Sequence, residues 1–238
     1  MIPSTPRSLL FCLLAVASAP ALALEPFVAS YQAYREGKLA GDAKMQVVQA
    51  DGSRWRVDLG IHGTRGLARL AGLNIEQSTV FDQPGQEYRP LSQGLVRNAV
   101  FNRRKSSGVY DWNTRTARWR GDIKQGRDAP VPLQEGDMSA LLMNLAVIRD
   151  AQPGRTLSYR VVENGRARQY EYAVAPQTEI VAVEDLSYDA MRVSRTNGGN
   201  DETIFWVASG VPTPIRILQR EDGLDVYDLR LVEYQGVQ

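Results

Sequence analysis

Side chains alternate between apolar and polar along most of this chain, and this period of two constrains the fold more than any other feature. In residues 27–34 (FVASYQAY) the apolar and aromatic side chains lie opposite Ser30 and Gln32. Residues 168–174 (RQYEYAV) and 227–231 (YDLRL) repeat the pattern. Because successive side chains of a strand point to opposite faces of its sheet, the pattern predicts strands with one buried face and one wet face.

Turn-forming residues separate the alternating runs, namely Asp51-Gly52, Asn164-Gly165, Asn197-Gly198-Gly199 and Asp222-Gly223. A tight hairpin needs positive φ at its centre, which these residue types adopt at low cost. The runs number on the order of a dozen, and no βαβ alternation, internal repeat or long linker interrupts them. We therefore predict a mainly β fold, a single antiparallel meander forming a strongly curved sheet or open barrel, with one domain over residues 24–238.

One principal helix is predicted among the strands, at about residues 137–150. Asp137 is a suitable N-cap, and Pro153-Gly154 would close the element. The apolar residues between them have the spacing of a buried helical stripe: Met138, Leu141, Leu142, Leu145, Ala146 and Ile148. We expect this helix to pack on the concave face of the sheet. A weaker helix candidate covers residues 64–73, where leucines recur every three residues but two glycines lower the helix propensity.

The first 23 residues have the features of a cleaved signal peptide. Arg7 precedes an apolar run at residues 9–17 that is too short to cross a bilayer, and Ala21-Leu22-Ala23 fits the small-x-small pattern of signal peptidase. Cleavage after Ala23 would remove the only cysteine, Cys12. The sequence therefore predicts a periplasmic protein whose mature chain has no transmembrane segment.

Composition and residue types exclude several classes of function. With 28 basic and 27 acidic side chains, the overall charge gives no reason to expect nucleic acid as a partner. A chain without cysteine from residue 24 onward has no disulfide or thiolate site, and His62, the only histidine, cannot form a histidine cluster for a metal. No nucleophile elbow, Ser-x-x-Lys pair or phosphate-binding loop occurs. We therefore predict no catalytic residue, no metal and no cofactor, and His62 is expected at a strand end or on the surface.

A local excess of positive charge is the one feature that suggests a binding surface. Residues 97–127 contain nine basic and two acidic side chains, a net +7, which leaves −7 on the rest of the chain after residue 23. The candidate ligand-binding or surface-binding residues in this segment are Arg103, Arg104, Lys105, Trp112, Arg118, Trp119 and Arg120. Such a surface would bind anionic lipid or another anionic envelope component, or an acidic partner. The competing interpretation, which we favour from alternation alone, is a solvated pair of hairpins whose tryptophans belong to the core.

Short motifs in a fixed order give the chain a resemblance to a known family. They are Pro26 to Tyr31 with Gly37 and Gly41, Gly66-Leu67-Ala68 leading to Ser78 to Phe81, Arg89-Pro90-Leu91, Asp137 to Leu142, and Phe205-Trp206 followed by Pro214 to Ile217. In these the chain resembles the domain of unknown function 3108 family of exported bacterial proteins. The resemblance implies a β-rich periplasmic domain, similar to the open barrel-and-helix arrangement of bacterial lipoprotein carriers. It supplies no catalytic or binding residues.

Two hypotheses of function remain open from the sequence. In the first, a non-enzymatic envelope protein binds an apolar or amphipathic, lipid-like ligand in the trough beside the helix at residues 137–148. In the second, an assembly or interaction factor docks a protein or an anionic surface without any small ligand. Lipid that co-purifies with the protein would favour the first hypothesis, and a reproducible protein partner would favour the second.

Overall fold

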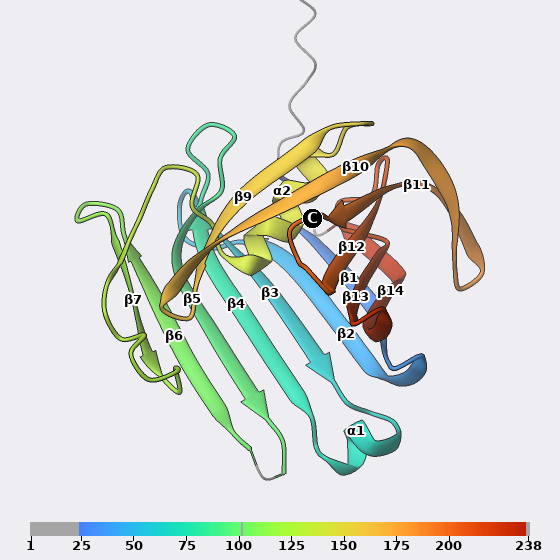
Figure 1. The fold of residues 1–238 in the computed structure, drawn as a ribbon, viewed down its shortest axis with the longest axis horizontal. Helices are drawn as coiled ribbons and strands as arrows, with labels where there is room; N and C mark the ends of the chain where they lie inside the picture. The colour runs from blue at the N-terminus through green and yellow to red at the C-terminus, as the bar shows by residue number, and fades with distance from the viewer. Residues whose placement is uncertain (1–23, 101, 237–238) are drawn as a thin grey trace, which may run out of the picture.

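The computed structural model describes residues 24–100 and 102–236, and all fourteen strands of these residues belong to one antiparallel sheet (Figure 1). In chain order the first eight strands are β1 (Phe27–Arg35), β2 (Lys38–Gln49), β3 (Arg54–His62), β4 (Asn74–Asp82), β5 (Arg89–Asn98), β6 (Arg104–Asp111), β7 (Thr116–Gly121) and β8 (Val131–Pro132). The remaining strands are β9 (Thr156–Glu163), β10 (Arg166–Val183), β11 (Leu186–Arg195), β12 (Asp201–Ala208), β13 (Arg216–Glu221) and β14 (Leu224–Gly236). The prediction of a mainly β, antiparallel fold is confirmed.

Pairing between the first and last strands closes most of the barrel. The strand order is β8-β7-β6-β5-β4-β3-β2-β1-β14-β13-β12-β11-β10-β9, so β1 and β14 are neighbours at its centre. Two meanders, one from each half of the chain, therefore join along this central pair. The two edge strands, β8 and β9, are consecutive along the chain, and the principal helix lies in the connection between them.

The predicted turns occupy the hairpins. Asn164 and Gly165 have φ of 50° and 72° between β9 and β10, and Asp222 and Gly223 have φ of 50° and 78° between β13 and β14. Positive φ at both central residues gives the turn a twist that matches the flanking strands. Gly52 and Gly199 also adopt positive φ, at 61° and 66°.

The principal helix, α2 (Ala140–Asp150), begins later than the sequence predicted. Ser139 is its N-cap, because the Ser139 hydroxyl accepts a hydrogen bond from the Leu142 N–H at 3.3 Å. The prediction that Asp137 caps the helix is wrong. The Asp137 carboxylate instead accepts the Gln134 N–H at 2.8 Å and pairs with Arg160 at 2.5 Å, so it stabilises the preceding turn.

Helix α2 contacts β9, β3 and β4, and most of its side chains belong to the main core. Figure 1 shows the helix between the β9–β10 ribbon and the β3–β4 part of the sheet. Leu142, Ala146 and Val147 are fully buried there. The predicted packing of the helix on the sheet is therefore confirmed.

The weaker helix candidate forms only one short helix, α1 (Gly66–Leu70), none of whose residues is buried. It connects β3 to β4 at the end of the sheet where β5 also turns into β6 (Figure 1). Among the described residues, no helix is long and apolar enough to span a membrane.

Candidate functional site

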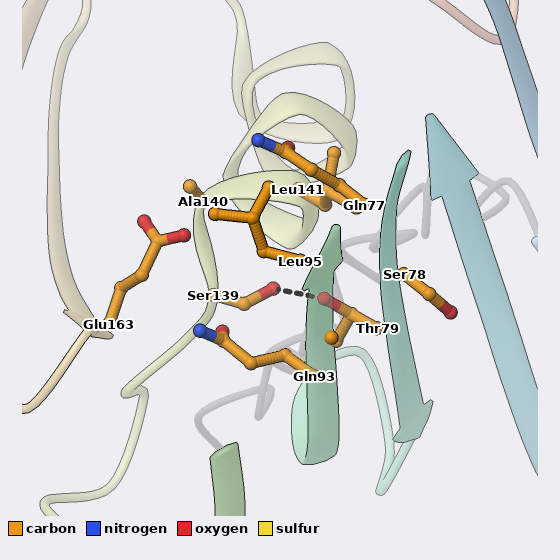
Figure 2. Close-up of a pocket in the computed structure, with 10 residues that line it drawn as sticks. Gln77, Ser78, Thr79, Gln93, Leu95, Ser139, Ala140, Leu141 and Glu163 are labelled. Carbon is orange, nitrogen blue, oxygen red and sulfur yellow. Dashed lines mark hydrogen bonds between the residues drawn. The ribbon is translucent and has the colours of Figure 1, made fainter. Parts of the chain in front are cut away.

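The space beside the helix start, where the sequence suggested a ligand, is a small polar hollow (Figure 2). Its volume is about 10 Å³, enough for one water molecule. The Ser139 and Thr79 hydroxyls hydrogen-bond across it at 2.9 Å, which ties α2 to β4. An acyl chain does not fit in this hollow, because α2 itself fills this part of the trough with side chains.

Polar groups of β5 and β9 also line the hollow. Outside its lining, the Tyr110 hydroxyl of β6 shares its one proton between Gln93 Oε1 of β5, at 2.7 Å, and the Val162 carbonyl of β9, at 2.6 Å. Glu163, at the end of β9, also lines the hollow. Burial raises the pKa of the Glu163 carboxyl above its usual value, and the nearby Arg168 opposes this shift only in part. Hydrogen bonds at and beside the hollow therefore connect the two meanders.

A much larger cleft, of about 480 Å³, opens at the other end of β4 and β5 from α1. The loop between β4 and β5, the turn between β6 and β7, and the segment before α2 form its walls. Its lining residues are Pro84, Glu87, Tyr88, Arg89, Trp112, Arg115, Leu133, Gln134, Glu135, Gly136 and Asp137. We call it the Trp112 cleft. Its volume falls within the range of small-molecule sites in proteins.

Ion pairs and aromatic contacts hold the Arg89 side of the cleft. Arg89 donates two hydrogen bonds to Asp82, at 2.8 and 2.5 Å. Its guanidinium carbon lies 5.9 Å from the centre of the Trp112 ring, and the Trp112 indole N–H donates to the Pro90 carbonyl at 2.7 Å. A bidentate pair fixes the guanidinium plane, so Trp112 is held against a rigid neighbour.

Tyr88 forms a second aromatic element of the wall. Its ring meets Phe81 edge to face, with ring centres 5.6 Å apart, and the Arg149 guanidinium lies 4.8 Å from the Tyr88 centroid. Burial raises the pKa of the Tyr88 hydroxyl from its usual value of about 10, although the positive charge of Arg149 acts in the opposite direction. Tyr88 therefore remains neutral at physiological pH.

Asp137 closes the floor of the cleft and has one unsatisfied oxygen. The residue is 1% exposed, and its Oδ2 accepts from Gln134 and Arg160. Its Oδ1 is buried without a hydrogen-bond partner among the described residues. A buried carboxylate oxygen without a partner costs free energy, which a donor group from a bound molecule or water would recover.

The residues predicted from the basic segment do not form one surface. Strand alternation and burial place Lys105, Arg118 and Arg120 on the exposed face of β6 and β7, and Arg104 on the opposite face. Arg103 is exposed just before β6. Trp112 lies at the far end of β6, in the cleft.

Trp119 is a core residue, as the competing interpretation held. It is 2% exposed in a second apolar cluster with Ala117, Leu133 and Val162, and its ring meets Tyr110 edge to face at 5.6 Å. A Cβ at Gly108 would lie 2.5 Å from the Trp119 indole nitrogen, so the glycine makes room for the indole.

Most residues of the Trp112 cleft gave no signal in the sequence. Tyr88, Arg115 and Leu133 lie in or beside turns, where no periodicity marks them. Arg89 was noted only within a family motif. The predicted strand-end position of His62 is confirmed, since it ends β3 and is exposed, with its ring nitrogens facing Asn74 at 3.0 Å and Glu76 at 3.4 Å. The described residues contain no group of three or more His, Cys, Asp and Glu side chains placed to hold a metal ion.

The fold and the cleft define a β-barrel-like protein with its principal helix between the two edge strands and a cleft at one end of the sheet. The chain belongs to the family described as Protein of unknown function (DUF3108), whose model matches residues 30–229. The resemblance found in the sequence is thereby confirmed. No curated protein matches the chain.

Two of the solved structures that match the chain illustrate the likeness, and only the first bears on the fold. One is the β-barrel-like protein of domain of unknown function DUF1849 from Brucella abortus, with 8% identity and a TM-score of 0.55, covering 91% of this chain and 100% of that one. The other is a DUF1089 family protein from Pseudomonas aeruginosa, with 11% identity and a TM-score of 0.37, covering 87% of this chain and 95% of that one. The first likeness supports the barrel-like fold, and neither the family nor these structures indicate a catalytic class.

Proposed function

We propose that this protein is an exported, non-enzymatic binding protein that holds a small amphipathic, lipid-like ligand in the Trp112 cleft. The observation that carries the proposal is the cleft itself, whose volume of about 480 Å³ combines two aromatic side chains with two arginines. This volume lies in the range of ligand sites, and charged side chains of both signs line the cleft beside the aromatic rings, a mixture that suits an amphipathic ligand. This location replaces the trough beside α2, which the helix occupies.

The walls of the cleft offer an amphipathic molecule both kinds of contact. Trp112, Tyr88 and Leu133 present apolar surface, and aromatic rings bury a large area with few rotatable bonds. The exposed Arg115 side chain, which follows the β6–β7 turn, can reach a polar head group at the mouth. The Asp137 Oδ1 atom at the floor favours a ligand that carries a hydrogen-bond donor.

Export to the periplasm is part of this proposal, and it rests on the leader-like residues 1–23, which lie outside the described residues. Determining the N-terminus of the protein recovered from the periplasm tests it. A mature chain that begins at Leu24 is expected. Recovery of Met1 at the N-terminus of the exported protein would contradict the proposal.

Native mass spectrometry of the protein purified from its own compartment tests ligand binding. We expect an added mass that dissociates on collisional activation and is identified as an amphipathic small molecule. The Trp112→Ala variant should lose this mass, whereas Arg118→Gln, on the exposed face of the neighbouring strand, should retain it. A protein without any bound molecule that instead recovers the same protein partner reproducibly would favour the role of an assembly factor.

A further inference from the structure

Three large apolar side chains are exposed together at the end of the sheet opposite the Trp112 cleft. Leu67 and Leu70 of α1 are 82% and 77% exposed, and Val100, in the loop between β5 and β6, is 59% exposed. Residues three apart lie on the same side of a helix, so the two leucines face one direction. Exposing this much apolar surface at one place is unfavourable unless something covers it.

Direct contacts hold the two loops side by side. The Val100 N–H donates to the Ala71 carbonyl at 2.8 Å, and a Cβ at Gly72 would lie 3.6 Å from Val100 Cγ2. The connection between α1 and β4 therefore packs against the β5–β6 loop, and Figure 1 shows both at the same end of the sheet. We call the described parts of residues 64–73 and 97–105 the leucine tip.

The charges of the leucine tip have one sign. Its two segments contain Arg65, Arg69, Arg97, Arg103, Arg104 and Lys105, and no aspartate or glutamate. Acidic residues border the tip without belonging to its two segments. The Asp122 carboxylate accepts the Lys105 backbone N–H at 2.8 Å, Glu76 faces His62 at 3.4 Å, and Asp42 accepts the Thr64 hydroxyl at 2.9 Å. The tip therefore surrounds exposed leucines with cationic side chains.

Two other strongly exposed apolar residues, Ile180 and Leu224, lie among acidic side chains. Ile180 is 72% exposed and pairs across the ladder with Asp189, next to Glu179. Leu224 is 73% exposed and follows Glu221 and Asp222, with Asp225 after it. The combination of apolar and basic residues thus distinguishes the leucine tip from these places.

We propose that the leucine tip is a peripheral membrane-docking surface, which inserts Leu67, Leu70 and Val100 into the interface of a bilayer that contains anionic lipids. Apolar side chains surrounded by arginine and lysine are suited to such an interface. The apolar side chains move out of water into the bilayer, and the basic side chains pair with lipid phosphates. The lack of acidic residues in the tip favours this occupant over an uncharged apolar partner. Docking in this orientation leaves the Trp112 cleft, at the other end of β4 and β5, facing away from the membrane.

Flotation with lipid vesicles tests the proposal. The chain is expressed from Met1 and purified, and its N-terminus is determined by mass, because an uncleaved apolar run at residues 9–17 would itself bind lipid. Vesicles of phosphatidylcholine alone are compared with vesicles that also contain phosphatidylglycerol, at low and at moderate salt. We expect binding that needs phosphatidylglycerol and weakens with salt.

Two sets of variants separate the apolar and the electrostatic contributions. Leu67→Ser with Leu70→Ser should lower the vesicle–water partition coefficient by about tenfold or more. Neither side chain then has apolar surface to transfer from water into the bilayer. Arg69→Gln and Arg103→Gln should each lower it by about fivefold. All four side chains are exposed, so none of these changes should alter the unfolding midpoint.

The matched control removes equal apolar surface at Ile180→Ser and Leu224→Ser and should leave binding unchanged. An equal loss in this control would overturn the proposal, as would the absence of binding to anionic vesicles. Loss of binding only in Arg118→Gln with Arg120→Gln would assign docking to the outer face of β7 instead. A dimer that dissociates in the leucine variant, measured by light scattering without lipid, would make the tip a contact between two copies.

Discussion

The packing of Trp119 between β6 and β7 depends on a single glycine. Gly108 lies opposite Trp119 on the neighbouring strand, and a Cβ there would sit 2.5 Å from the indole nitrogen. Gly108→Ala should therefore lower the free energy of unfolding by about 1–3 kcal/mol, the usual effect of overpacking a core. Urea unfolding measures the change. Gly94→Ala on adjacent β5, where a Cβ would meet nothing within 4 Å, is the matched control. An equal loss of stability at both glycines would show that the contact with the indole is not its cause.

The half-buried carboxyl of Glu163 predicts a pH dependence of stability. Burial raises the pKa of Glu163 in the folded protein, so the folded state binds a proton more tightly than the unfolded state does. The group contributes fully to stability at acidic pH, and this contribution is lost as pH rises through the folded pKa. Glu163→Gln should therefore be more stable than the wild type at neutral pH and equally stable at acidic pH, by urea unfolding. The exposed Glu171→Gln serves as control. A neutral-pH stability unchanged by Glu163→Gln would contradict the inferred shift.

At the scale of elements, α2 takes the place that a ligand would need in an open trough. Leu145 is 3% exposed in the main core, and Leu145→Ala should cost about 2–5 kcal/mol of unfolding free energy. The half-buried Asn144 provides a control in the same helix, because Asn144→Ala removes little apolar contact. Thermal and urea unfolding measure both variants. If Leu145→Ala unfolded like the wild type, the helix would not be part of the core.

The strands and helices were predictable from the sequence where apolar residues recur at a regular spacing. Alternation predicted strands such as β1, and the turn residues predicted their hairpins, because both depend on neighbours along the chain. The start of α2 was misplaced by the good capping chemistry of Asp137, whose carboxylate is instead bound by Arg160 of β9. That contact joins residues 23 positions apart, and no local pattern indicates it.

At the scale of the whole molecule, the decisive contact is also nonlocal. The pairing of β1 with β14 joins the two ends of the chain and brings the two meanders together. The Trp112 cleft forms where three connections meet at one end of the sheet, so no single segment of sequence reveals it. The candidate residues of the basic segment lie apart for a local reason, since β6 and β7 present alternate residues to opposite faces.

The two ends of the sheet carry different kinds of side chains, so the molecule would bind a membrane in one preferred orientation. One end has the leucine tip, with exposed apolar side chains and positive charge, and the other end has the Trp112 cleft. A protein that docks through the first end presents its cleft to the surrounding solution. The proposed membrane-docking surface and the proposed ligand site thus lie at opposite ends of one sheet.

The most direct test of a ligand in the Trp112 cleft uses the tryptophans as reporters. The chain has four, of which Trp112 lines the cleft, Trp119 and Trp206 are buried elsewhere and Trp55 packs against the main core. Each indole N–H gives a separate signal in a ¹⁵N-correlated NMR spectrum, and single Trp→Phe variants assign them. Adding the amphipathic molecule extracted from the native protein should shift the Trp112 signal in a saturable way and leave the Trp206 and Trp55 signals in place. Shifts confined to the other indoles, or no shift at saturating concentrations, would contradict binding in this cleft.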